Sequence, residues 1–175
     1  MKRFGITILL LMVCLLQASI VYADIYTDES GIKYVYKVGE SDATVKGDGH
    51  YESDVFPGQT WLSGDITILD KFTVDGVEYT VTTIDRGAFN YCTDITGITI
   101  PKTITYIGRA AFGACENVTD VWCYANPNNM HWWEPDTYYV SFKPDKATRF
   151  HVQDGMLAAW QTLYADANVT YVDDL

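Results

Sequence analysis

The sequence predicts a β-rich α/β solenoid, in which short repeats stack and present parallel strands on one face. Residues 80–102 and 103–125 align without a gap at a constant offset of 23 residues. Each copy alternates apolar and polar residues over a short stretch, and each is too short to bury its apolar side alone. Copies of this kind must stack, and stacking builds a continuous wall rather than an enclosed pocket. The repeat therefore favours binding over catalysis.

The two copies keep the same residue types in register. The identical pairs are Thr80/Thr103, Thr82/Thr105, Ile84/Ile107, Arg86/Arg109, Ala88/Ala111, Phe89/Phe112, Cys92/Cys115 and Thr96/Thr119. Apolar character is also kept in Val81/Ile104, Ile95/Val118 and Ile98/Val121. A fixed period in the twenties with recurring apolar and small residues is typical of a solenoid.

The N-terminus has the pattern of an export signal. Lys2-Arg3 precedes the apolar run Ile6–Leu16, and Val21-Tyr22-Ala23 supplies small residues for cleavage. The run is too short to span a membrane. We expect a signal peptide over residues 1–23, cut near Ala23, and a secreted or cell-surface protein without a transmembrane segment in the mature chain. Lipid attachment at Cys14 is the less favoured alternative, because bulky residues precede it.

Removal of this leader leaves an acidic chain long enough for one domain with a sizeable core. The chain has 12 Lys and Arg against 23 Asp and Glu, and losing Lys2 and Arg3 takes the formal net charge from −11 to −13. Such a charge disfavours nucleic acid and anionic membranes as partners.

The remaining cysteines indicate a core role. Cys92, Cys115 and Cys123 are an odd number without CxxC spacing, which disfavours both a disulfide framework and a zinc site. Because Cys92 and Cys115 are equivalent in the repeat, we expect them to lie one above the other as buried thiols. A disulfide between them is the alternative.

The segments before the repeats read as β structure. Residues 25–45 alternate like a hairpin that turns at Gly39–Asp42, and residues 47–64 have loop composition. Asp65–Ile68 echoes the repeat strand, and Asp75-Gly76 predicts a tight hairpin turn.

Within the repeat, alternation predicts which side chains face the core. Ile98 and Ile100 alternate with Gly97 and Thr99, so the isoleucines are expected to be buried. Pro101 ends this strand because proline cannot donate to the ladder.

After Ala125 the repeat pattern is lost. A strand over residues 149–152, a helix over 156–164 and a last strand over 169–172 are expected to close the stack. The expected divisions are the signal peptide (1–23), an N-terminal β cap (24–63), the repeats (64–125, with a partial repeat over 64–79 and full repeats over 80–102 and 103–125), and an aromatic insertion with a C-terminal cap (126–175).

The repeat resembles the BspA-like leucine-rich repeats of bacterial cell-surface and secreted proteins. The family pattern has an apolar strand ending in Pro, an Ile-Gly turn, and Ala-Phe and Cys at fixed offsets. This pattern is found in Ile98–Pro101, Ile107-Gly108, Ala111-Phe112 and Cys115, and again upstream in Ala88-Phe89 and Cys92. Asp85 stands where the family usually has Gly.

The resemblance is specific over residues 80–125 and weaker over 64–79. Residues 147–152 and the helix after them resemble the family's closing strand and helix, and residues 25–45 resemble its N-terminal hairpin cap. The resemblance implies a curved right-handed leucine-rich-repeat stack, exported, that acts in adhesion or ligand binding without enzymatic activity. The implied partner is a protein, for example a component of a host extracellular matrix.

The side chains that alternate with the buried ones are the candidate ligand contacts. This strand face comprises Thr67, Thr99, Asp120, Trp122, Arg149 and His151. Trp122 stands out because an exposed indole on a regular sheet has no packing reason to be there. The competing reading is that residues 126–146 fold back and cover it.

A second candidate surface follows the repeats. His131, Trp132, Trp133 and Tyr138 could stack on sugar rings, which makes a glycan the alternative ligand. The alternative interpretation is that these aromatic side chains cover the end of the solenoid and bind no ligand.

Enzymatic activity is not expected. The sequence lacks HExxH, GxSxG and a phosphate-cradling glycine loop. We therefore predict no catalytic residues, no metal site and no cofactor.

Overall fold

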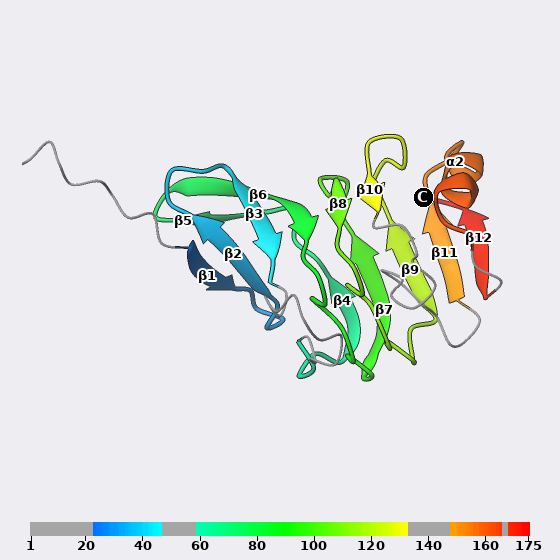
Figure 1. Ribbon diagram of the computed structural model, residues 1–175, viewed down its shortest axis with the longest axis horizontal. Helices are drawn as coiled ribbons and strands as arrows, with labels where there is room; N and C mark the ends of the chain where they lie inside the picture. Colours follow the sequence, from blue (N-terminus) through cyan, green and yellow to red (C-terminus); the bar gives the residue numbers. More distant parts are fainter. Residues whose placement is uncertain (1–22, 47–58, 133–147, 166–167) are drawn as a thin grey trace, which may run out of the picture.

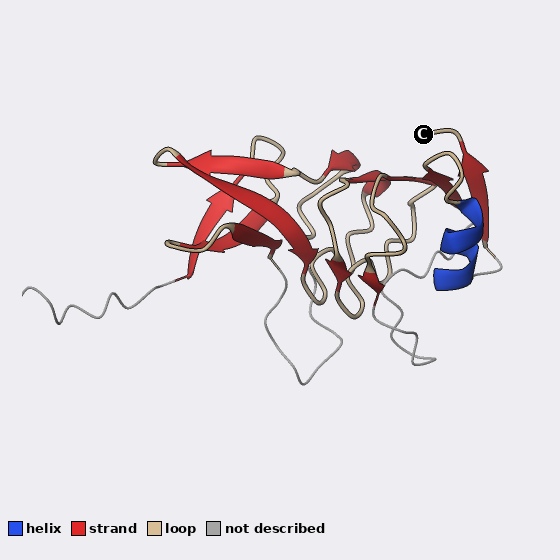
Figure 2. Cartoon of the chain, turned by 90° about the horizontal axis from the view of Figure 1, so that it is seen from above, coloured by secondary structure: helices blue, strands red, loops and turns tan. Residues whose placement is uncertain are grey.

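The computed structural model describes residues 23–46, 59–132, 148–165 and 168–175. Figure 1 shows an elongated molecule in which β1–β3 lie at one end, the stacked repeats follow, and β11, α2 and β12 lie at the other end. The described strands form two sheets, and Figure 2 shows how strands and loops alternate along the stack. The molecule is thus a strand-rich repeat solenoid, as the sequence predicts.

The larger sheet joins the N-terminal strands to one side of the repeats. Its order is β1-β2-β3-β6-β8-β10, with β5 paired to β6. Its strands are β1 (Ala23–Thr27), β2 (Lys33–Lys37), β3 (Asp42–Val45), β5 (Lys71–Val74), β6 (Val77–Ile84), β8 (Tyr106–Ile107) and β10 (His131–Trp132). Pairing is antiparallel within β1-β2-β3 and β5-β6, and parallel from β3 through β6 and β8 to β10.

The smaller sheet carries the candidate face. It runs in the order β12-β11-β9-β7-β4, and every pair in it is parallel. Its strands are β4 (Gly64–Thr67), β7 (Ile95–Ile100), β9 (Asp120–Cys123), β11 (Thr148–Val152) and β12 (Val169–Asp173). Parallel strands separated by long connections are what stacked repeats produce, because each copy returns to the same edge of the sheet.

The hairpin predicted at Asp75-Gly76 is confirmed. Asp75 has φ 50° and Gly76 has φ 80°, and the turn joins β5 to β6. A two-residue hairpin turn of type I′ needs positive φ at both central residues, which Gly adopts freely and Asp tolerates. The predicted hairpin over residues 25–45 is also found, as β2 and β3 in antiparallel register.

Successive copies are joined through their turns as well as their strands. The backbone N–H of Phe89 donates to the carbonyl of Ala111 at 2.7 Å, and that of Tyr91 donates to Gly113 at 2.8 Å. The Phe89 and Phe112 rings stack with centroids 5.2 Å apart and planes 3° apart. The second copy therefore repeats the conformation of the first, one strand spacing further along.

Alternation correctly predicts the buried side of the small sheet. Ile98, Val121 and Phe150 occupy one inward row, and each is at most 1% exposed. The other predicted inward residues of these strands are also buried: Ile66, Ile68, Ile100, Cys123 and Val152.

The cysteines behave as core thiols. Cys92, Cys115 and Cys123 are buried and free. Burial raises the pKa of Cys92 and of Cys123 to about 12, and it raises that of Cys115 as well. The thiols therefore stay protonated at neutral pH and pack as small apolar groups.

The C-terminal elements continue the small sheet beyond the last repeat strand. The helix expected at residues 156–164 is α2 (Leu157–Leu163), and the strand expected at 169–172 is β12. Trp160 of α2 is fully buried against Phe150, with ring centroids 5.3 Å apart. The hydroxyl of Tyr171 donates to the carbonyl of Tyr164, which ties β12 to the end of α2. No helix among the described residues is long and apolar enough to cross a membrane.

The larger sheet continues past the residue at which the repeat pattern is lost. β10 pairs in parallel with β8, so that His131 lies opposite Tyr106 and Trp132 opposite Ile107. The residues after Ala125, expected to start an insertion, thus add one more strand to the larger sheet. The parallel pairing of strands therefore continues for one strand beyond the point at which the sequence stops matching the repeat.

The repeat turn makes a prediction about stability. Ala110 has φ 52° at the position where the first copy has Gly87, with φ 64°. Alanine in this left-handed region costs about 1–2 kcal/mol, part of which is offset by the lower entropy of its unfolded state. Ala110→Gly should therefore raise the free energy of unfolding by about 0.5–1 kcal/mol in urea titrations.

Ala111→Gly is the matched control. Ala111 is fully buried and is not among the residues with positive φ, so the same change should lower stability by about 0.5–1 kcal/mol. Equal destabilisation by both variants would contradict the role assigned to the turn.

Candidate functional site

The outward side chains of the small sheet form two rows. Register places Asp65, Gly97, Asp120, Arg149 and Thr170 side by side in the first outward row. The second outward row contains Thr67, Thr99, Trp122, His151 and Val172. All six residues predicted for the strand face lie in these rows, and the structure brings them onto one surface.

The rows are less open than alternation alone indicates. Thr67 and Arg149 are exposed, and Thr99 and Trp122 are half-buried. Asp120 and His151, expected to face solvent, are only 7% and 9% exposed. That expectation is corrected for these two residues, since neighbouring side chains cover them and bond to them.

Asp120 is the centre of a charged network. Its Oδ1 lies 2.8 Å from Nε of Arg149 and 3.0 Å from Nε2 of His151, while Nη2 of Arg149 donates to Oδ2 at 2.9 Å. The hydroxyl of Thr119 donates to the same Oδ2 at 2.9 Å. On its other side, Nδ1 of His151 lies 2.9 Å from Oδ1 of Asp174. The network therefore connects β9, β11 and the residue after β12.

This network keeps Asp120 ionised. Burial alone would raise the pKa of its carboxyl group. Hydrogen bonds from Arg149, His151 and Thr119 act in the opposite direction and together lower that pKa to about 2. Asp120 is thus a fixed negative charge at any physiological pH, and its acceptor positions are already occupied. A ligand would meet Arg149 here rather than a free carboxylate.

Trp122, in β9, contacts residues of both neighbouring strands, β11 and β7. Its ring stacks on the imidazole of His151, with centroids 5.4 Å apart and planes 14° apart. On the other side it reaches over Gly97, where an added Cβ would lie 2.9 Å from the indole. The glycine leaves room for the ring, so Trp122 lies across the face and is only partly buried.

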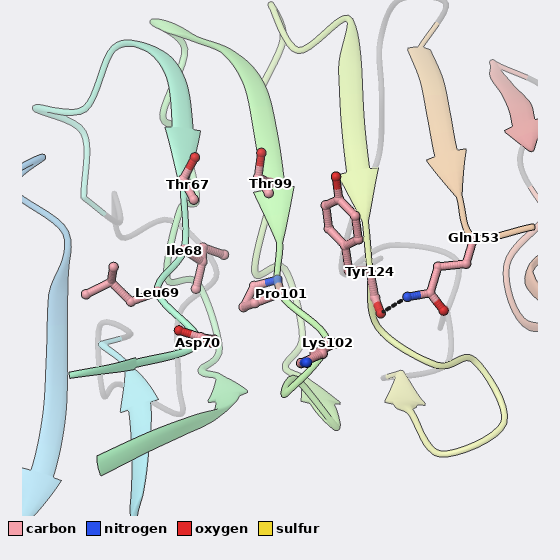
Figure 3. A pocket seen from close by; sticks show the side chains of 9 residues that line it. All are labelled: Thr67, Ile68, Leu69, Asp70, Thr99, Pro101, Lys102, Tyr124 and Gln153. Atoms are coloured by element: carbon pink, nitrogen blue, oxygen red, sulfur yellow. Dashed lines mark hydrogen bonds between the residues drawn. The ribbon is translucent and has the colours of Figure 1, made fainter. Parts of the chain in front are cut away.

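A groove opens where these strands end. Its volume is about 340 Å³. Figure 3 shows its lining: Thr67, Ile68, Leu69, Asp70, Thr99, Pro101, Lys102, Tyr124 and Gln153. Tyr124 is 39% exposed, and Nε2 of Gln153 donates to its carbonyl at 3.0 Å. Asp70 and Lys102 are exposed charges of opposite sign in the same lining.

Sequence reasoning missed most of this groove. Pro101, Tyr124 and Gln153 each follow directly after a predicted strand residue, at the next outward position. The signal was available, because extending the alternation one residue past Ile100, Cys123 and Val152 would have reached them.

A second hollow adjoins the groove. Its volume is about 420 Å³, and Thr67 and Leu69 line both hollows. Its other lining residues are Tyr26, Asp28, Glu29, Ser30, Lys71, Phe72 and Thr73. The candidate surface thus extends from the repeats toward the N-terminal strands.

The part of the alternative aromatic site that the structure describes lies on the larger sheet. His131 is exposed in β10 and stacks on Tyr106, with ring centroids 5.6 Å apart. Trp132 also belongs to β10, and Trp133 and Tyr138 lie outside the described residues. Because β10 pairs with β8 of the larger sheet, His131 and Trp132 are not part of the strand face.

The described residues show no group of three or more His, Cys, Asp or Glu side chains that could hold a metal ion.

Fold and surface together define a class of protein, a repeat solenoid with an outward strand face bordered by a groove. A family model described as "BspA type Leucine rich repeat region (6 copies)" matches residues 69–134, which include the strands from β5 to β10. Residues 69–134 are therefore a BspA-type leucine-rich-repeat region, and the family resemblance is confirmed. Searches of curated proteins and of solved structures gave no match.

The charged network predicts the effect of Asp120→Asn. The variant keeps the shape of the side chain but removes the charge shared by Arg149 and His151, so we expect unfolding to become easier by about 1–2 kcal/mol in urea titrations. Asp65→Asn is the control in the same row, because Asp65 is exposed and accepts a hydrogen bond from the Thr96 hydroxyl at 2.7 Å. Indistinguishable midpoints for the two variants would rule out a stabilising network.

Proposed function

We propose that this protein is an exported, non-enzymatic leucine-rich-repeat module that recognises a protein ligand through its strand face. The family of residues 69–134 supports the general class, since BspA-type repeats indicate a protein-binding or adhesion module. In the proposal, the two outward rows and the adjoining groove are the contact surface.

The groove beside the rows is the observation that carries this proposal. Ile68, Leu69 and Pro101 give its lining an apolar part, while Thr67 and Thr99 add hydroxyl groups. An apolar centre with polar surroundings is the usual anatomy of a protein interface. Tyrosine, the type of residue at position 124, is one of the three types enriched among the residues that dominate binding energy at protein interfaces.

Export rests on the sequence of the leader. The basic pair Lys2-Arg3, the apolar run Ile6–Leu16 and the small residues before Asp24 form the pattern of a cleaved signal. In this proposal the mature chain acts outside the cell, either released or held at the surface. The acidic composition suits a soluble extracellular protein that does not bind nucleic acid.

The architecture of the stack belongs to the same proposal. The family resemblance implies a right-handed coil, and the antiparallel strands β1–β3 and the elements β11, α2 and β12 flank the repeats as caps. Caps of this kind stop further copies from adding to the open ends of a solenoid. Recognition would then be confined to the strand face.

Tyr124→Ala tests the strand face directly. The mature chain is passed over a panel of purified extracellular-matrix proteins and over a glycan array, and the protein that is captured serves as the probe. Loss of a hot-spot tyrosine costs about 2 kcal/mol of binding, so Kd should rise about 30-fold. The midpoint of thermal unfolding should change no more than in the control variant below, because Tyr124 is 39% exposed.

Tyr91→Ala is the matched control for this test. Tyr91 is 43% exposed and lines neither of the two hollows described above, so its removal should leave capture unchanged. Capture that survives Tyr124→Ala but is lost in His131→Ala would move the site to the larger sheet. Hits confined to the glycan array, with that same dependence on His131, would establish the glycan alternative instead.

A further inference from the structure

We propose that His151, in its charged form, positions Trp122 on the strand face and thereby makes this surface responsive to pH. The inference concerns regulation of the same site and rests on the proposed function.

The geometry around the imidazole calls for two donors. Nε2 of His151 lies 3.0 Å from Oδ1 of Asp120, and Nδ1 lies 2.9 Å and 3.0 Å from the two oxygens of Asp174. A carboxylate only accepts hydrogen bonds, and a neutral imidazole has a single N–H. Both contacts can be hydrogen bonds only when the ring carries both protons. The arrangement is therefore built for the imidazolium ion.

The charges facing His151 come from two other segments of the chain. β9 supplies Asp120, and the residue after β12 supplies Asp174. On its own strand, Arg149 is drawn to Asp120. In the register, the β12 residue opposite His151 is Val172, which carries no charge. The ring is thus clamped between two carboxylates, with one guanidinium attached to the more buried of them.

The two carboxylates differ in their access to water. The Asp120 side chain is 10% exposed, whereas the Asp174 side chain is 47% exposed. Asp120 also keeps its bonds to Arg149 and Thr119 when the ring loses a proton. The remaining N–H is therefore expected to stay with Asp120, and Asp174 is expected to turn to water. Deprotonation would release the C-terminal side of the clamp.

Loss of the hydrogen bond to Asp174 would affect Trp122 because the indole stacks on the His151 ring. The imidazole covers one side of the indole at a centroid distance of 5.4 Å, and a charged ring is attracted to an aromatic face more strongly than a neutral one. When the clamp opens on one side, the imidazole is held by a single hydrogen bond and the indole loses a fixed neighbour. His151 acts on the face through Trp122, as a positioning residue.

The direction of the pH effect follows from the balance around His151. Burial lowers its pKa, but hydrogen bonds to Asp120 and Asp174 raise it by more, so the folded pKa lies above the usual 6.5. The stability contributed by the clamp is then fully present below pH 6.5 and is lost as pH rises through the folded pKa. Asp120 remains ionised throughout, because its own pKa is about 2.

An NMR titration of the isotope-labelled mature chain tests the proposal without any ligand. The imidazole Cε1–H signals and the indole Nε1–H signals are followed from about pH 5 to about pH 9, the range in which histidine titrates. His151→Gln and Trp122→Phe assign the two resonances. We expect His151 to titrate with a midpoint above 6.5, and the Trp122 signal to shift with the same midpoint. A Trp122 signal that does not follow His151, or a His151 midpoint at or below 6.5, would overturn the proposal.

Two further variants keep the test decisive if His151→Gln folds poorly. Asp174→Asn removes one carboxylate from a half-exposed position, so it should lower the His151 midpoint and weaken the coupled Trp122 shift. His131→Gln is the control, because His131 stacks on Tyr106 of the larger sheet and should leave the Trp122 titration as it is. An unchanged His151 midpoint in Asp174→Asn would also overturn the clamp.

The same measurements separate this inference from the proposed function. If the titrations are coupled and capture still ignores Tyr124→Ala, the strand-face function fails while the His151–Trp122 coupling stands. If capture depends on Tyr124 but Trp122 does not follow His151, the function stands and the pH inference fails. If both hold, capture of the matrix probe should weaken as pH rises through the His151 midpoint, and His151→Gln should abolish that dependence.

Discussion

Main-chain hydrogen bonds between successive copies are the constraint on which the rest of the structure depends. Each strand of the small sheet pairs in parallel with the strand of the next copy, and the turns pair as well, as in the bond from Phe89 N–H to the carbonyl of Ala111. Buried backbone groups must find partners, so one copy dictates the conformation of the next. Phe89 then stacks on Phe112. Equivalent side chains of successive strands line up in the same way, in inward and outward rows. The arrangement of the outward side chains thus follows from the hydrogen bonds that pair the backbone of successive copies.

Local chemistry then decides what each outward position becomes. Gly97 and Asp120 lie in the same row but differ in role. Gly97 has no side chain and leaves room for the Trp122 indole, whereas the Asp120 carboxylate makes four hydrogen-bonding contacts. Neighbouring strands bring Arg149 and His151 onto Asp120, so three predicted contact residues become one internally satisfied unit. Such a unit is rigid while both carboxylates hold the imidazole. In the proposed function, the contact surface is then the strip that lines the groove, from Thr67 through Thr99 to Tyr124.

The repeat allowed the sequence to predict the fold well and the site only in part. Period and alternation predicted the strands and the buried rows, and the Asp-Gly dipeptide predicted the turn at Asp75-Gly76, because each depends on residues close together in the chain. The bond between His151 and Asp174 depends on how β12 returns beside β11, and no periodicity reports that return. The burial of Asp120 is equally non-local, since Arg149 and His151 come from a strand that follows a long connection. The groove residue Tyr124 was within reach of the alternation but lay just beyond the assumed strand end.

The joining of copies at β7 and β9 has a consequence for how such a protein can diversify. Duplication of one repeat between these strands would add a strand about 4.8 Å wide, and the added strand would replace the β7–β9 backbone bonds by equivalent bonds to each of its neighbours. Thr99 would move away from Trp122, and Pro101 from Tyr124, so the groove would widen by one step. The cluster of Asp120, Arg149 and His151 would be untouched, because it lies wholly on the C-terminal side of the insertion. The number of repeats would therefore set the width of the groove, and the charged cluster would stay the same.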